Sequence, residues 1–178
     1  QGKFPSPQKG FRSLGQEAIY AAALRLRRGP AWSKDGAWRG DVVGPLIRDL
    51  GVSLAFTDDV EMALNAQVGK AGAPSDGRDL HVGDADRGVV MVAAPLSIAT
   101  CTVTGYALAF ARRGEQRVTV SFIGEGGSSL GEWHEAINLA AAMRLPAIFC
   151  VQNNQTALSV PVGQQTRART FADKALGY

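Results

Sequence analysis

Long apolar runs and blocks of like charge are both missing from this chain of 178 residues. No apolar stretch approaches the roughly 18 residues of a membrane span, and no signal peptide opens the sequence, so we expect a cytoplasmic protein without a membrane partner. The 19 basic and 16 acidic residues are interspersed and leave a net charge of only +3. Because no basic block carries interleaved aromatic residues, the composition argues against nucleic-acid binding.

Cysteine and histidine are also scarce, with two of each. Cys101 falls in a run of small residues and Cys150 in an apolar run, so we expect two buried thiols and neither a disulfide nor a catalytic cysteine. His134 has two acidic neighbours, Glu132 and Glu135, but no second histidine at metal-binding spacing. This pattern favours a polar helix face over a metal cluster.

The hydrophobic content of 46% is enough for one domain with a sizeable core over residues 1–178. The helix expected at residues 97–112 is crowded with small residues, which suits either interior packing or a subunit contact. The other elements expected outside the central segment are an extended arm at 1–12, helices at 16–28, 45–50 and 58–68, the last capped by Thr57-Asp58, and a long loop at 71–87.

The central segment reads as a strand, a helix and a second strand. Residues 118–123 are β-branched and aromatic and stop at a glycine, as a buried parallel strand does. The turn at residues 124–127 leads into a helix, where Ser129 and Glu132 match a capping box. Residues 147–151 form a second apolar run. The pattern predicts an α/β fold with a mainly parallel sheet.

Polar residues follow both strands at the edge where ligands of parallel sheets bind. Glu125 comes after the first strand and Asn154 after the second. A carboxylate and an amide oxygen suit a hard cation such as Mg²⁺, which leaves part of its coordination for phosphates. Gly126 and Gly127 allow the backbone to approach a phosphate, and the following helix start offers N–H donors. The sequence therefore predicts a metal–diphosphate site.

Two alternatives stay open for these residues. The letters GEGGSS resemble a dinucleotide-binding turn, but the next strand ends in Gln152 and two asparagines where that site needs an acidic residue. Glu125 could also be a solvated turn residue. For His81, in the long loop, both a structural role and a contact with a cofactor stay open, and a histidine in a loop more often has a structural role.

The same residues resemble the thiamine diphosphate signature, G-D-G followed by N-N, and the flanking sequence is similar to the alpha subunit of the 2-oxo acid dehydrogenase decarboxylating component. Residues 14–18 (LGQEA) are similar to its early helix, Trp38-Arg39 stand where it has Tyr-Arg, and residues 78–84 (RDLHVGD) resemble its G-x-M-H-x-G-D loop. Residues 94–96 (APL) match the S-P-L stretch of branched-chain members. The resemblance covers nearly the whole chain.

This resemblance implies a thiamine diphosphate-binding fold, a mainly parallel sheet with helices on both faces, and a family domain that continues past residue 178. It implies decarboxylation of a 2-oxo acid and acyl transfer to lipoyl. The implied partners are a beta subunit or beta domain, assembled with the alpha part as two of each, and a lipoyl acyltransferase core. It leaves the catalytic residue unassigned. The implied metal ligands are Glu125, the Asn154 side chain and the Thr156 carbonyl; the implied cofactor contacts are Trp38, Arg39, Leu96, Gly124, Gly126, Gly127, Gln152 and Asn154.

Departures from the family pattern affect the substrate and the diphosphate contacts. Glu125 replaces aspartate, as in branched-chain members, and this favours branched 2-oxo acids. Trp38 replaces tyrosine and leaves Arg39 as the clear phosphate partner in its stretch. Two alternatives remain: another thiamine diphosphate enzyme half, of the acetoin dehydrogenase or transketolase-like kind, and a non-catalytic assembly module of the same fold.

Overall fold

A computed structural model of the chain describes residues 13–178, so the arm predicted at 1–12 lies outside the described residues. The chain divides into two compact units. The first, here the N-terminal unit, comprises residues up to Asp41 together with Pro45–Ala94. The second, the C-terminal unit, comprises Val42–Gly44 and Pro95–Tyr178. That residues 1–178 form one domain stays a prediction.

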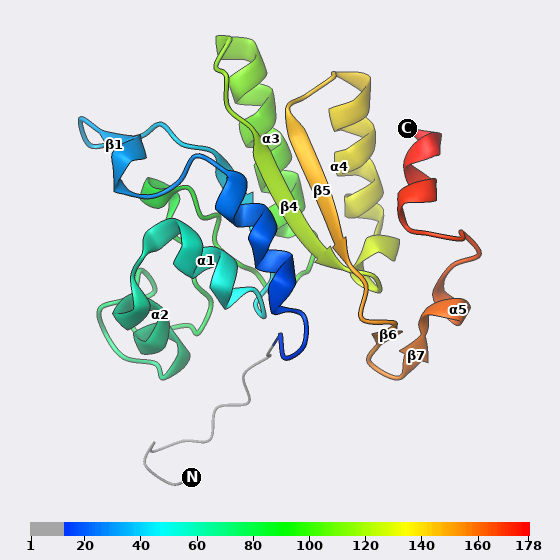
Figure 1. Ribbon diagram of the computed structural model, residues 1–178, viewed down its shortest axis with the longest axis horizontal. Helices are drawn as coiled ribbons and strands as arrows, with labels where there is room; N and C mark the ends of the chain where they lie inside the picture. The colour runs from blue at the N-terminus through cyan, green and yellow to red at the C-terminus, as the bar shows by residue number, and fades with distance from the viewer. Residues whose placement is uncertain (1–12) are drawn as a thin grey trace, which may run out of the picture. The chain divides into compact units, whose positions relative to one another are not determined.

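The C-terminal unit is built on a parallel three-stranded sheet in the order β3-β4-β5. Figure 1 shows β4 and β5 side by side. Residues 119–123 of β4 are all buried, as its continuous apolar and β-branched sequence predicts for a central strand. The α/β class and the parallel sheet are thereby confirmed. The strand bounds are β3 (Val42–Gly44), β4 (Thr119–Gly124) and β5 (Ala147–Gln152).

Two helices flank this sheet and pack against each other: α3 (Ile98–Arg113) and α4 (Gly131–Ala142). The small side chains of α3 let it approach closely, and the Thr100 hydroxyl lies 2.8 Å from the Ser121 hydroxyl of β4. On α4, the Trp133 ring meets the edge of Phe149 of β5 at 5.5 Å. At 16 residues α3 is too short to cross a bilayer, and no other helix in residues 13–178 is long and apolar enough.

The capping box predicted at the start of α4 is wrong. Ser129 instead ends a 3₁₀ turn, η4 (Gly127–Ser129), and α4 begins two residues later without a side-chain cap. The Ser128 hydroxyl donates to the Glu125 carbonyl at 2.6 Å, which tightens this turn. Serine hydroxyls that bond the nearby backbone favour such turns over a helix start.

The chain beyond β5 forms a small hairpin and two short helices that no sequence pattern predicted (Figure 1). The C-terminal Tyr178 ring stacks on His134 of α4, with the centroids 6.2 Å apart and a hydrogen bond between the Tyr178 hydroxyl and Nδ1 of His134. The bounds are β6 (Thr156–Ala157), β7 (Val160–Pro161), α5 (Val162–Gln165) and the 3₁₀-helix η5 (Ala172–Gly177).

The N-terminal unit contains short helices and one small hairpin. The helix predicted at 16–28 is a shorter 3₁₀-helix, and the one predicted at 45–50 is wrong, because the Asp49 carboxylate accepts from the Leu46 N–H at 2.9 Å and closes a turn there. The bounds are η1 (Glu17–Arg25), η2 (Pro30–Trp32), β1 (Ser33–Lys34), β2 (Ala37–Trp38), α1 (Leu50–Thr57), α2 (Val60–Gln67) and η3 (Ala85–Arg87).

The predicted cap of α2 is one residue too early. Asp58 ends α1 in the left-handed conformation, with φ of 52°. Asp59 is the residue that caps α2, since its carboxylate accepts from the Met62 N–H at 2.8 Å. Aspartate suits both places, because it tolerates the left-handed region and is a strong N-cap.

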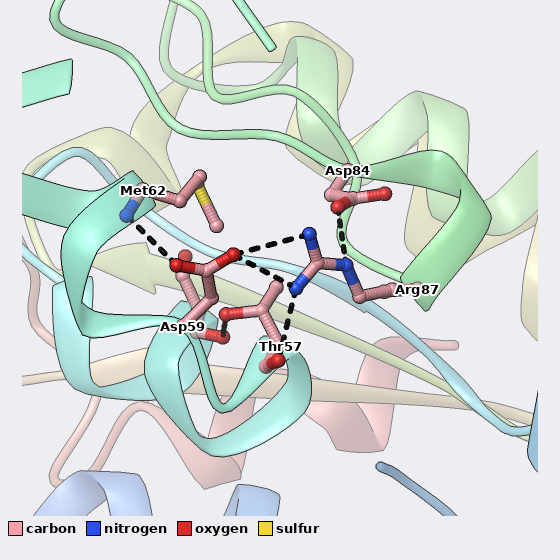
Figure 2. A network of polar contacts seen from close by, with 6 residues as sticks. Thr57, Asp59, Met62, Asp84 and Arg87 are labelled. Carbon is pink, nitrogen blue, oxygen red and sulfur yellow. Dashed lines mark hydrogen bonds and ion pairs between the residues drawn. The ribbon is translucent and has the colours of Figure 1, made fainter. Parts of the chain in front are cut away.

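Arg87 ties the long loop to the α1–α2 junction, as Figure 2 shows. Its guanidinium donates to the Thr57 carbonyl at 3.0 Å and to the Asp59 carboxylate at 3.3 Å. Its Nε lies 2.7 Å from the carboxylate of Asp84. Asp84 and Val89 also exchange two backbone hydrogen bonds, of 2.8 and 2.9 Å, so the segment around Arg87 has a fixed shape although it is mostly loop.

We expect Arg87→Met to destabilise the chain by about 1–2 kcal/mol, because it leaves two carboxylates and a carbonyl without their shared donor. We expect no larger loss of stability because the Arg87 side chain is 38% exposed and solvent screens its charge. Urea unfolding followed by circular dichroism measures the change. The matched control is Arg112→Met on the exposed side of α3, which should shift the unfolding midpoint little; equal effects of both substitutions would contradict this assignment.

The prediction of two buried thiols is also wrong. Cys101 is exposed on α3 and Cys150 is half-buried in β5. The helical period explains Cys101, because the buried residues of α3 include Ala99, Thr100 and Val103 and leave it on the other side. Partial burial and the nearby charge of Glu132 raise the pKa of the Cys101 thiol above its ordinary value.

Candidate functional site

Glu125 occupies a buried position at the end of β4. Only 2% of this residue is exposed, and its backbone N–H donates to the Gln152 carbonyl at 3.2 Å. The preceding Gly124 pairs with Gln152 in the parallel register, so the ends of β4 and β5 lie side by side. The Oε1 atom of Glu125 is buried and has no hydrogen-bond partner among the described residues.

Burial of the Glu125 oxygen without a partner lowers the stability of the fold. A buried polar atom without a partner costs about 1–3 kcal/mol relative to one that is satisfied. Buried charged groups in proteins are normally paired or coordinate a metal. The position of Glu125 therefore fits a carboxylate that binds a cation and does not fit the solvated turn residue of the open alternative.

The loop after β5 presents Asn154 in a turn of its own. The Asn154 side-chain oxygen accepts from the Thr156 N–H at 3.2 Å, and that of Asn153 accepts from the Gln155 N–H at 3.0 Å. Gln155 has φ of 73°, in the left-handed region that reverses the chain here. An amide oxygen has two lone pairs, so this bond leaves Asn154 one pair for a cation.

The two glycines after Glu125 have a packing role. A Cβ at Gly126 would lie 2.4 Å from Cβ of Ala157 in β6, and one at Gly127 would lie 2.9 Å from Ile123 and 3.3 Å from Leu96. The distance from Gly126 to Ala157 and the distance from Gly127 to Ile123 are both below the 3.0 Å that real Cβ atoms keep. Glycine is thus required here by close contact with the protein itself; a contact of these glycines with a diphosphate stays a prediction.

The predicted site residues fall in both units. The C-terminal unit brings five of them to the adjacent ends of β4 and β5: Gly124, Glu125, Gly126, Gly127 and Gln152. Leu96 lies near Gly127, Asn154 is in the loop that follows β5, and Thr156 begins β6. Trp38, Arg39 and His81 belong to the N-terminal unit, so their part in the site stays a prediction.

Within that unit, Trp38 has structural partners. Its indole N–H donates to the Asp41 carbonyl at 2.8 Å, and its ring lies 6.2 Å from that of Phe56. A Cβ at Gly88 would lie 2.4 Å from the indole nitrogen, so this glycine makes room for the ring. Arg39 is exposed, and its contact with a diphosphate stays a prediction.

His81 is held by Asp79 in the long loop. Nδ1 of His81 lies 2.6 Å from the Asp79 carboxylate, which also accepts from the His81 N–H at 3.2 Å. Partial burial raises the pKa of Asp79, but the hydrogen bonds and charge of His81 outweigh it and set the pKa below the ordinary value of 3.8. The contact selects the tautomer with the proton on Nδ1 and leaves Nε2 as the acceptor.

The lowered pKa of Asp79 predicts an acid-sensitive contact. The folded pKa lies below the unfolded one, so the stabilisation is fully present above about pH 3.8 and is lost as the pH falls through the folded pKa. A ¹³C NMR titration of the Asp79 carboxyl should give a midpoint below 3.8. In His81→Ala the midpoint should rise towards the ordinary value, because the imidazole contact is lost while the backbone N–H of residue 81 still donates to the carboxylate. An unchanged midpoint would contradict the contact.

Sequence reasoning missed two residues that lie against the turn of Glu125 and Gly126. Ser128 is 1% exposed and fixes the Glu125 carbonyl through both its hydroxyl and its N–H. Gln165 of α5 places its side-chain oxygen near Gly126. The serine could have been found from the GEGGSS motif, whereas nothing in the local sequence marks the glutamine.

Clusters of metal-binding side chains are another possible kind of site. In residues 13–178 no group of three or more His, Cys, Asp and Glu side chains is placed to hold a metal ion. The site at Glu125 is of a different kind, because its candidate donors are one carboxylate with amide and backbone oxygens, the hard ligands that suit Mg²⁺.

Comparison with known proteins places this chain in a family. Residues 31–178 match the family described as Dehydrogenase E1 component. The chain is 44% identical over 176 residues to the 3-methyl-2-oxobutanoate dehydrogenase subunit alpha of Mycobacterium tuberculosis, a match that covers 92% of this chain and 40% of that protein. It is 36% identical over 143 residues to the 2-oxoisovalerate dehydrogenase subunit alpha of Bacillus subtilis, covering 78% of this chain and 43% of that protein.

A third relative is similar over a shorter stretch. The pyruvate dehydrogenase E1 component subunit alpha of Staphylococcus aureus is 49% identical over 72 residues, covering 40% of this chain and 20% of that protein. The chain thus spans less than half the length of each of these relatives. Because the family match extends over most of the sequence, the chain belongs to the dehydrogenase E1 component family.

Proposed function

We propose that this chain is the part of a branched-chain 2-oxo acid dehydrogenase alpha subunit that binds Mg²⁺ and the diphosphate of thiamine diphosphate. The observation that supports this most is the buried, unpartnered carboxylate oxygen of Glu125, which directly follows β4 where its end pairs with that of β5. A cation would satisfy that oxygen and attract the diphosphate.

The residues of the C-terminal unit fit such a group. Glu125 and the Asn154 side chain would bind the cation with the Thr156 carbonyl, and Gln152 with Leu96 would line the cofactor pocket. When bound, thiamine diphosphate supplies the electron sink for decarboxylation of a 2-oxo acid. The protein's own part is to hold the cofactor tail, to orient it and to neutralise its charge.

The residues of the N-terminal unit add to the proposal. Arg39 would bind diphosphate oxygens, because an exposed guanidinium is suited to bidentate phosphate contacts. Trp38 would lie beside it, with its ring fixed by Asp41 and Phe56. His81, oriented by Asp79 with Nε2 available, would serve as an acceptor close to the substrate.

The whole protein would transfer the acyl group of its substrate to lipoyl on an acyltransferase core, together with a beta subunit or beta domain, as a cytoplasmic heterotetramer. Two relatives named for 3-methyl-2-oxobutanoate and 2-oxoisovalerate support a branched substrate, as does glutamate in the GEG turn. The Staphylococcus relative, named for pyruvate, makes pyruvate the second candidate.

The substrate class can be tested with the full-length protein and its beta partner, supplied with Mg²⁺, thiamine diphosphate and lipoylated acceptor. We expect kcat/KM for 2-oxoisovalerate to exceed that for pyruvate by roughly 10-fold or more, the scale that a few methyl groups contribute in an apolar pocket. Acetoin should not react. A preference for pyruvate would support the second candidate, and turnover of acetoin alone would support an acetoin dehydrogenase.

A further inference from the structure

A second unpartnered oxygen is buried near Gly126, the residue that follows Glu125. Oε1 of Gln165, in α5, is buried and has no hydrogen-bond partner among the described residues. The same side chain is held at its other end, where Nε2 donates to the Val160 carbonyl at 2.8 Å. Because this bond fixes which end of the amide is the oxygen, Gln165 presents an acceptor and not a donor.

The oxygen faces the turn that holds the candidate cation ligand. A Cβ built on Gly126 would lie 3.8 Å from Oε1 of Gln165, and Gly126 directly follows Glu125. The turn after β4 thus contains one buried oxygen without a partner, that of Glu125, and its Gly126 lies near a second one, that of Gln165. Ala157 of β6 lies against the same glycine, so the hairpin and α5 fold back onto this turn.

Because Oε1 of Gln165 is an acceptor, its partner has to be a cation or a hydrogen-bond donor. Diphosphate oxygens offer no proton to an amide oxygen, and bringing two sets of acceptors together is unfavourable. A hydrated cation can satisfy it in two ways, by direct coordination or through a bound water that donates a hydrogen bond. Mg²⁺ suits both, because it takes oxygen ligands and keeps several waters.

We propose that Gln165 is a further residue of the metal site and supplies its side-chain oxygen to the hydrated cation. This inference rests on the proposed function, since it assumes that the cation binds at Glu125. In this arrangement α5 closes the site from the side of the hairpin, and the Val160 carbonyl keeps the amide in the required orientation.

The test compares Gln165→Met with Gln164→Met in the full-length protein. Methionine keeps the length of the side chain and removes the amide; Gln164 is the exposed neighbour on the same helix. Calorimetric titration with Mg²⁺ at saturating thiamine diphosphate should show affinity roughly 10-fold to 100-fold lower for Gln165→Met, as for loss of other groups that support a metal site. Gln164→Met should bind like the wild type.

A second measurement separates a metal role from a folding role. The melting temperature without metal reports any loss of the Val160 contact, and the number of waters on bound Mn²⁺, from water-proton relaxation, reports the metal shell directly. A direct ligand predicts one additional water in Gln165→Met, and a water-mediated contact predicts an unchanged count with faster water exchange.

The outcomes distinguish this inference from the proposed function. If the wild type and both variants bind Mg²⁺ equally, with the same water count and exchange rate, the inference is overturned and the metal site at Glu125 stands. If the wild type binds neither Mg²⁺ nor thiamine diphosphate, the proposed function fails together with it. Gln165→Met can also lower the melting temperature without metal. In that case an unchanged number of waters on Mn²⁺ and an unchanged water exchange rate would still refute the inference.

Discussion

Glu125→Met is expected to abolish the metal site and at the same time to raise the melting temperature of the metal-free protein. The substitution removes a buried oxygen that has no partner and fills nearly the same volume with apolar atoms. We expect a gain of about 1–3 kcal/mol without metal, or a few degrees in melting temperature. Magnesium affinity should fall by at least about 100-fold, because the only candidate carboxylate ligand is gone.

The control for this substitution is Glu132→Met, which changes an exposed glutamate near the start of α4. It should leave both the melting temperature and the affinity for Mg²⁺ close to those of the wild type. Differential scanning calorimetry with and without Mg²⁺ and thiamine diphosphate measures both quantities on the same samples. A Glu125→Met protein that is less stable without metal, yet still stabilised by the ligands, would contradict the role assigned to Glu125.

Gly126→Ala is the second change with a large expected effect. Its Cβ would lie 2.4 Å from Cβ of Ala157, so either the turn after β4 or the β6–β7 hairpin has to move. Overpacking of this kind costs about 1–3 kcal/mol of stability. The shift would separate Glu125 from the loop of Asn154, and misplacement by about 1 Å at a site can reduce its function by roughly 100-fold.

The clash can be relieved at its other partner. In the double variant Gly126→Ala, Ala157→Gly, the methyl group changes sides, and we expect most of the Mg²⁺ affinity and stability to return. Gly131→Ala is the matched control, because nothing lies within 4 Å of its Cβ and alanine is the better helix former. Calorimetric titration and urea unfolding check each variant. Failure of the double variant to recover would show that Gly126 is needed for a reason other than this contact.

The centre of the fold could be predicted from the sequence because it obeys strong local rules. The buried run of β4, the glycine turn that leads into α4 and the apolar run of β5 each identify one element, and their order implies a parallel sheet. The strand β3 escaped prediction because Val42–Gly44 is too short to show any period. The helix expected at 45–50 failed because the Asp49 side chain closes a turn there, which a count of helix formers does not register.

The candidate site, too, has features that the local sequence marks and features that it does not. Glu125 could be predicted because two glycines and the end of a strand mark it in the sequence. That its oxygen is buried without a partner, and that Gln165 has another, follows from how α5 and the hairpin fold back onto the turn. Packing between segments far apart in the chain has no local signature, so these features require the structure.

In the proposed site, Glu125 and Asn154 jointly bind the cation that holds the diphosphate. The most direct measurement is anomalous diffraction from crystals of the full-length protein grown with Mn²⁺ and thiamine diphosphate. We predict one Mn²⁺ peak within coordination distance of the Glu125 carboxylate and the Asn154 side-chain oxygen. A peak elsewhere, with those two groups pointing apart and diphosphate density away from the ends of β4 and β5, would contradict it.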